Sequence, residues 1–142
     1  MPHHTSLSII FCCILLSACA GFASPTQGPT LAPWDPQPSD LRMQRGEAEL
    51  TSVKIITLES DPRQFSLSIR GALPTPCHQL RVTVSQSNDR LSIDFEVYSV
   101  FDPDEICIQV LEPIAEEIPI GVLTNGESLI SVNGNRIGEI KP

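Results

Sequence analysis

Apolar and polar residues alternate along most of the chain after Leu50. In the clearest stretch, Phe65, Leu67 and Ile69 alternate with serine and arginine, and the same alternation recurs at short intervals. A period of two places one face of a segment in a core and the other in water, which is typical of antiparallel β-sheets. The pattern predicts strands over residues 53–58, 65–70, 80–85, 91–98, 106–110, 118–122, 129–132 and 137–140.

Turn-forming residues separate these segments. Asp61-Pro62 and Asp102-Pro103 interrupt strand pairing, because proline cannot donate a hydrogen bond to a neighbouring strand. Asn133-Gly134 tolerates the positive φ of a tight turn, so residues 128–132 and 136–140 are predicted to pair as a hairpin. Seven or eight short strands predict an all-β fold, a small antiparallel β-sandwich of immunoglobulin-like type. A small closed β-barrel is the alternative.

The first residues are expected to form an export signal. Leu7 to Leu16 is an apolar run of ten residues, which is typical of a signal-peptide core and too short to span a bilayer. The run ends in Leu16-Ser17-Ala18-Cys19, which resembles the lipobox of bacterial lipoproteins. The resemblance implies that residues 1–18 are removed and that Cys19 becomes a first mature residue carrying a diacylglyceryl thioether. The alternatives are cleavage after a neighbouring small residue, which would give a soluble secreted protein, and a start that is not cleaved.

A proline-rich segment follows this signal. Residues 19–49 contain five prolines among glycine, serine, threonine and glutamine, and no apolar period runs through them. Proline fixes φ and donates no hydrogen bond, so such a segment favours extended, solvated conformations. Trp34 lies within it, either packed loosely on the domain or available to dock on a glycan or a partner. We therefore expect a signal peptide over 1–18, a lipid-anchored linker over 19–49 and one β-sandwich domain over 50–142.

Two cysteines remain in the predicted domain, Cys77 and Cys107. An exported protein meets an oxidising compartment, where a disulfide is the expected state of such a pair. The alternation raises a difficulty, because Cys107 lies on the face opposite the isoleucines and valine of the predicted strand 106–110. Either a bulge near Pro103 changes which residues of this strand face the core, or the disulfide lies outside the core.

A set of short motifs runs through the predicted domain. These are Gly71-Ala-Leu-Pro-Thr-Pro-Cys77, Cys107, Leu111 to Ile114, Ile118 to Leu123, and the hairpin Ser131 to Gly134. By these motifs, residues 50–140 resemble a group of uncharacterised bacterial secreted proteins and lipoproteins. The resemblance implies a β-sandwich and points to no known activity.

Negative charge is concentrated in the second half of the chain. Residues 94–142 carry ten acids and two bases, whereas residues 20–93 carry seven of each, within a formal net charge of −8. Phosphate binding requires clustered lysine and arginine, so this balance argues against a nucleic-acid partner. Asp102, Asp104 and Glu105 form an acidic loop that is the candidate contact for a partner.

The sequence offers little for catalysis or metal binding. His78 is the only histidine after Cys19, and no G-x-S-x-G nucleophile motif is present. A zinc site on the two domain cysteines and His78 would lack a fourth ligand at the usual spacing. The loop after Asp102 departs from the EF-hand calcium pattern. We therefore expect no catalytic residues, no metal and no cofactor.

Export, lipid attachment and an acidic β-domain together indicate a non-enzymatic module of the cell envelope, facing away from the cytoplasm. The expected partners are the membrane, through the lipid on Cys19, and an envelope protein or glycan. The alternative is a secreted inhibitor of a protease or of a lysozyme-type hydrolase, acting through a loop such as 72–79 or 101–105.

Replacement of Cys19 tests the anchor. The mature wild-type protein should partition into detergent, and Cys19→Ser should leave the chain unprocessed or soluble, because the thiol that accepts the lipid is lost. Mass spectrometry of the mature amino terminus is the measurement. A free amino terminus at Gly21 or Ser24 in the wild-type protein would show plain secretion instead.

Overall fold

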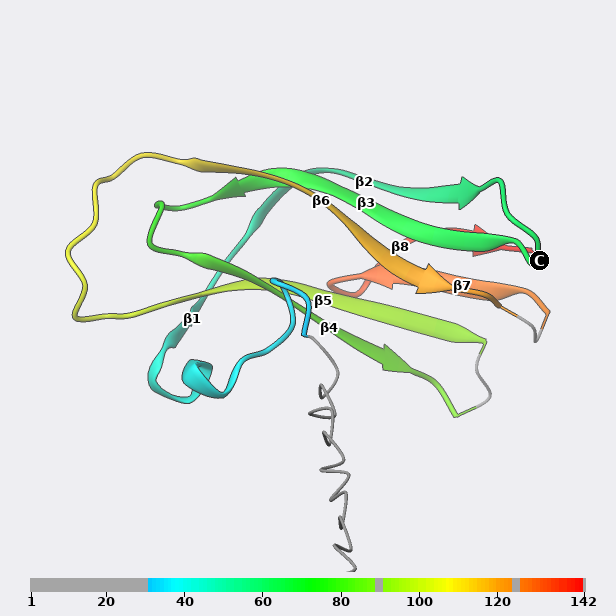
Figure 1. Ribbon diagram of the computed structural model, residues 1–142, viewed down its shortest axis with the longest axis horizontal. Coiled ribbons are helices and arrows are strands. Elements are labelled where there is room, and N and C mark those ends of the chain that lie inside the picture. The colour runs from blue at the N-terminus through cyan, green and yellow to red at the C-terminus, as the bar shows by residue number, and fades with distance from the viewer. Residues whose placement is uncertain (1–30, 89–90, 124–125, 142) are drawn as a thin grey trace, which may run out of the picture. The chain divides into compact units, whose positions relative to one another are not determined.

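Two β-sheets pack face to face in the part of the chain that the structure describes (Figure 1). The computed structural model describes residues 31–88, 91–123 and 126–141, and the expected signal peptide and Cys19 lie outside these ranges. The predicted all-β sandwich is confirmed, and the alternative of a closed barrel is wrong. Within the described ranges, no helix has the length and apolar character needed to cross a membrane.

A three-stranded and a five-stranded sheet make up the two layers. The elements are the 3-10 helix η1 (Pro38–Arg42) and the strands β1 (Gln44–Gly46), β2 (Glu49–Leu58), β3 (Gln64–Leu73), β4 (Gln79–Gln86), β5 (Ser92–Phe101), β6 (Glu112–Gly121), β7 (Ser128–Val132) and β8 (Asn135–Ile140). The smaller sheet has the order β2-β3-β6. In the larger sheet, β5 pairs with β4, β1 and β7, and β7 pairs with β8.

The described strand pairs are antiparallel, as the alternation predicts, except for one. β7 runs parallel to residues 92–95 of β5, whereas β1 pairs antiparallel with the far end of β5. Asn133 lies in the turn of the predicted β7–β8 hairpin and has a φ of 49°. Its side chain forms hydrogen bonds with the stretch of β5 that lies between these two partner strands. Val97 N donates to Asn133 Oδ1 at 2.7 Å, and Asn133 Nδ2 donates to Val97 O at 3.0 Å. One side chain therefore continues the hydrogen bonding of β5 between β1 and β7.

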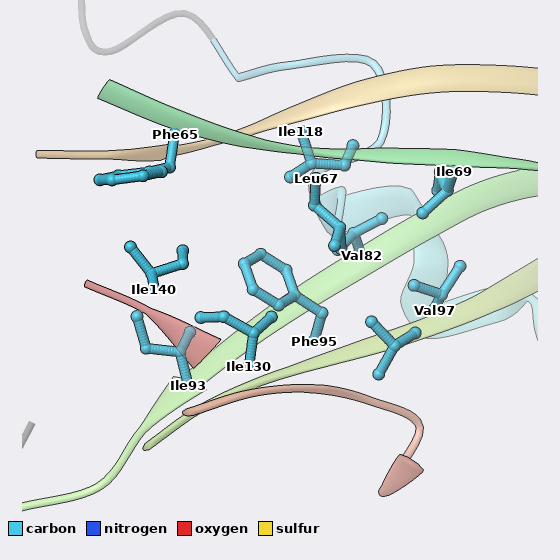
Figure 2. Close-up of a cluster of buried hydrophobic side chains, with 11 residues drawn as sticks. Phe65, Leu67, Ile69, Val82, Ile93, Phe95, Val97, Ile118, Ile130 and Ile140 are labelled. Carbon is cyan, nitrogen blue, oxygen red and sulfur yellow. The ribbon is translucent and has the colours of Figure 1, made fainter. Parts of the chain in front are cut away.

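The inward faces of the sheets form one hydrophobic core (Figure 2). Leu67 and Ile69 of β3 and Ile130 of β7 are completely buried, and the ring of Phe95 lies between the layers. Burying a side chain of this size contributes about 1.5–3 kcal/mol, so this cluster supplies the main favourable free energy of folding. The cluster consists of Phe65, Leu67, Ile69, Val82, Ile93, Phe95, Val97, Ile118, Ile130, Val132 and Ile140.

The segment between β5 and β6 departs from the predicted pattern. Residues 102–111 form no strand, although the alternation predicts one over 106–110. The chain leaves the five-stranded sheet at Phe101 and enters the three-stranded sheet at Glu112 (Figure 1). The segment therefore crosses from one layer to the other at the end of the sandwich, where neither sheet offers it a neighbouring strand.

Residues 31–46 form a strap that belongs to the folded domain. The compact unit begins at Leu31, whereas the alternation of apolar and polar residues begins only after Leu50. Trp34 packs against the core, as one of its two predicted roles required, and Trp34 O accepts a hydrogen bond from Val82 N of β4 at 2.8 Å. Because the strap also contains β1, it adds a strand to the five-stranded sheet.

Arg81 fastens the strap to β4. Its side chain is only 2% exposed, although it lies on the outward face of β4, opposite Tyr98 in the register. Nε and Nη2 donate to the two carboxylate oxygens of Asp40 at 2.7 and 2.9 Å. Nη1 donates to Leu80 O at 2.8 Å and to Pro33 O at 3.4 Å. A buried charge requires a partner and hydrogen bonds, and the strap supplies both.

Acid should remove the stabilisation that this ion pair provides. Hydrogen bonds from Arg81 hold the pKa of Asp40 below its ordinary value. The ion pair therefore adds its full amount to the free energy of unfolding above the ordinary aspartate pKa of about 3.9, and this amount is lost as the pH falls through the lower folded-state pKa. The Asp40→Asn variant lacks this stabilisation at every pH. At pH 7 the wild-type free energy of unfolding should exceed that of Asp40→Asn by roughly 2–3 kcal/mol.

Denaturant titrations of the two proteins at neutral pH and at about pH 2 provide the measurement. The difference between them should be smaller in acid than at neutral pH, because protonation of Asp40 weakens the ion pair. A difference that is the same at both pH values would contradict this role for the Asp40 carboxylate.

Candidate functional site

The disulfide between Cys77 and Cys107 braces the segment that crosses between the sheets. It joins this segment to the turn between β3 and β4, with the two Cα atoms 6.1 Å apart and a sequence separation of 30. The predicted disulfide is confirmed. Residues 102–111 are therefore a disulfide-braced loop, called the cystine loop.

The structure also decides between the two explanations of the alternation around Cys107. The bridge lies outside the core, and the neighbours of Cys107 face water rather than the interior. Ile106 is 100% exposed and Ile108 is 68% exposed. In an extended segment, successive side chains point to opposite sides, so Cys107 can face the domain while these two isoleucines face away.

Four large apolar side chains are exposed along the cystine loop. Besides the two isoleucines, Val110 and Leu111 are each more than half exposed. Apolar residues scattered singly over a surface are normal, whereas a run of them in one place indicates a contact surface for another molecule. Sequence reasoning assigned 106–110 to the core and missed this surface. The signal that could have revealed it was the position of Cys107 on the opposite face of the same run.

The three predicted contact residues lie at the start of the cystine loop. Asp102, Asp104 and Glu105 are all exposed. Asp102 Oδ1 accepts from Asp104 N at 3.0 Å, and Asp102 O accepts from Glu105 N at 3.2 Å, so the acidic residues sit on a turn. The structure thus brings them next to the exposed apolar run. Among the described residues, no group of histidine, cysteine and acidic side chains is arranged to hold a metal ion.

A small pocket lies between the cystine loop and the turn that precedes β4. Its volume is about 210 Å³, and its lining includes His78, Phe101, Asp102 and Glu105. The ring of His78 stacks on Phe101 with centroids 4.6 Å apart, and His78 Nδ1 forms a hydrogen bond of 2.8 Å with the Thr75 hydroxyl. Small-molecule sites usually have volumes of roughly 300–1,000 Å³, so this pocket suits a single side chain of a partner better than a separate ligand.

A larger groove lies on the outward face of the five-stranded sheet, and sequence reasoning did not foresee it. The groove has a volume of about 680 Å³. The Arg45 guanidinium pairs with Glu96 at 2.5 Å, and this hydrogen-bonded contact lowers the pKa of Glu96 below its ordinary value. Its lining is Arg45, Gly46, Glu47, Ala48, Thr83, Val84, Ser85, Asp94, Glu96, Val97, Tyr98, Asn133 and Gly134.

These features place the chain in the class of two-layer β-sandwich domains. Residues 67–141 match the family model of the ORF11 beta-sandwich domain, and the chain belongs to this family. The match begins within β3, so it covers the cystine loop but not the strap or β2. No curated protein and no solved structure matches the chain.

Removal of the disulfide should destabilise the domain while leaving its core intact. In the chain-entropy model, closing a loop of this length stabilises by about 3–4 kcal/mol. Replacing both Cys77 and Cys107 by serine should therefore lower the melting temperature by more than about 10 °C. Chemical shifts of buried residues such as Phe95 should stay unchanged at room temperature, because the bridge lies outside the core. A melting temperature that is unaffected by reduction would contradict this account.

Proposed function

We propose that the protein is a non-enzymatic binding module of the cell envelope that docks on a partner protein through the cystine loop. The observation that carries the proposal is the exposure of Ile106 and its apolar neighbours on a loop held in place by a disulfide. Such side chains gain free energy when a partner covers them. The disulfide restricts the loop before binding, which lowers the conformational entropy lost on docking.

The charge around the loop indicates the chemistry of the partner. Asp102, Asp104 and Glu105 precede the apolar run, and no lysine or arginine occurs between Arg90 and Arg136. A second copy of the loop would bring like charges together, which disfavours self-association through this surface. We therefore propose a partner with an apolar cleft bordered by lysine and arginine side chains.

The proposed anchor also indicates where the partner is found. If Cys19 carries lipid, the protein is held at a membrane surface that faces away from the cytoplasm. The partner is therefore expected in the same compartment.

Inhibition of an exported hydrolase is a second candidate function. The fully exposed Ile106 lies next to a disulfide-bonded residue on a loop without regular secondary structure, a shape that can enter an active-site cleft. A screen of the purified domain against proteases and lysozymes separates this function from simple docking. Inhibition that Ile106→Asp abolishes would favour the inhibitor.

The test of the docking proposal compares the two ends of the sandwich. A photo-reactive residue is placed at Ile106 and, as a control, at Leu58, an exposed apolar residue at the end of β2 on the opposite side of the molecule (Figure 1). An envelope protein should be cross-linked from position 106 only. The cross-linked protein is then identified and purified so that binding can be measured directly.

Binding of the purified partner should depend on the loop. Ile106→Asp should weaken it at least about tenfold, the effect expected from losing one buried apolar side chain, and Leu58→Asp should leave it unchanged. Added salt should weaken binding as well, because the acidic residues are exposed. Equal effects of the two substitutions, or affinity that is independent of both, would overturn the proposal.

A further inference from the structure

The groove on the outward face of the five-stranded sheet has room for a ligand of its own. Its volume of about 680 Å³ lies within the range of roughly 300–1,000 Å³ that is usual for small-molecule sites. Its lining comes from β1 and the residues that follow it, from β4 and β5, and from the turn at Asn133-Gly134. No residue of the cystine loop contributes to its lining, so this is a separate site.

A positively charged side chain of the protein already occupies part of the groove. The Arg45 guanidinium carbon lies 3.7 Å from the centre of the Tyr98 ring, a cation–π contact. The same guanidinium pairs with Glu96, whose second oxygen accepts from Thr83 Oγ1 at 3.2 Å. The groove therefore contains a binding position for a cation, made of one aromatic face and one carboxylate.

The groove carries more negative charge than Arg45 can balance. Glu47, Asp94 and Glu96 line it, and among the described residues Arg45 is the only basic one in its lining. Arg81 lies across the strand pair from Tyr98, but its charge is already paired with Asp40. The excess negative charge favours a positively charged ligand over a neutral or acidic one.

The contacts of Arg45 are of a kind that a ligand can replace. The side chains of Arg45 and Glu96 are 52% and 50% exposed. Ion pairs and cation–π contacts are weak where water reaches both partners. Asp94 occupies the neighbouring outward position of β5, and its carboxylate accepts a hydrogen bond from Ser131 Oγ at 2.5 Å. This hydrogen bond does not involve Arg45, so the carboxylate keeps its position when a ligand displaces Arg45.

We propose that this groove binds an organic cation bearing a primary ammonium or guanidinium group, which takes the place of Arg45 on Tyr98 and Glu96. The source of this group can be a free polyamine or a lysine or arginine side chain in a peptide. In either case, the Arg45 side chain competes with the ligand for the contacts with Tyr98 and Glu96. This site is independent of docking by the cystine loop.

Titrations with defined probes test the proposal on the mature chain. The probes are spermidine and agmatine as free amines, the amidated peptide Arg-Gly-Arg, and a neutral trisaccharide of N-acetylglucosamine. Binding is followed by NMR signals of the Tyr98 ring and by calorimetry. The free amines and the peptide distinguish the two sources of the cation, and the sugar tests the competing ligand class.

Two substitutions in the groove should change affinity in opposite directions. Glu96→Gln should weaken cation binding about three- to tenfold, because it removes the charge that holds the cation. Arg45→Gln should strengthen cation binding severalfold, because it removes the guanidinium that competes for Tyr98 and Glu96. Glu139→Gln, which removes an exposed partner of Arg136 outside the groove, should have no effect and serves as the control.

The opposite signs separate this proposal from a purely structural role for the pair. If Arg45→Gln weakens cation binding, Arg45 contributes to the site instead of competing for it, and the proposal is overturned. Binding of the trisaccharide without binding of any cation overturns it as well, and so does the absence of binding by every probe. None of these outcomes bears on the cystine loop, which lies elsewhere on the domain.

Discussion

The buried ion pair between Arg81 and Asp40 determines the arrangement of the amino-terminal part of the domain. Arg81 lies on the outward face of β4, where the strap covers it, and an uncompensated charge in that position would be strongly unfavourable. The strap provides the carboxylate and one of the backbone carbonyls that bond the guanidinium, and β4 itself provides the other acceptors. Held there, it packs Trp34 against the core and brings β1 beside β5. Because β1 carries Arg45, the groove on the same face depends on this pair for one of its sides.

The cystine loop is positioned in a different way, by a covalent bond and not by packing. Its apolar side chains contribute nothing to the core, and the domain gains from the loop mainly through the Cys77–Cys107 bridge. Residues on such a loop can bind a partner without weakening the sandwich. Binding residues often lie on loops that a rigid scaffold holds in position. The two candidate sites therefore differ in what supports them: the groove rests on the strap, and the cystine loop rests on the disulfide.

The sequence predicts the parts of this structure that depend on local pattern. Alternation along β3, β4 and β5, the turn at Asn133-Gly134 and the pairing of the only two cysteines after Cys19 all follow from residue type and spacing. The strap could not be predicted in this way. Its proline-rich composition is typical of a solvated linker, whereas its attachment to the domain depends on a tertiary contact with Arg81. Residues 106–110 show the converse error, since a period of two describes any extended chain, whether or not a strand lies beside it.

A double-mutant cycle on Arg81 and Asp40 tests the central claim most directly. Free energies of unfolding are measured for the wild-type chain, Asp40→Ala, Arg81→Met and the double variant. Each single substitution should cost roughly 3 kcal/mol, because it leaves the other charge without its partner. The double variant should be more stable than the sum of the single effects implies, by about 1–3 kcal/mol. Additive effects, or single substitutions that each cost less than about 0.5 kcal/mol, would show that the strap does not depend on this ion pair.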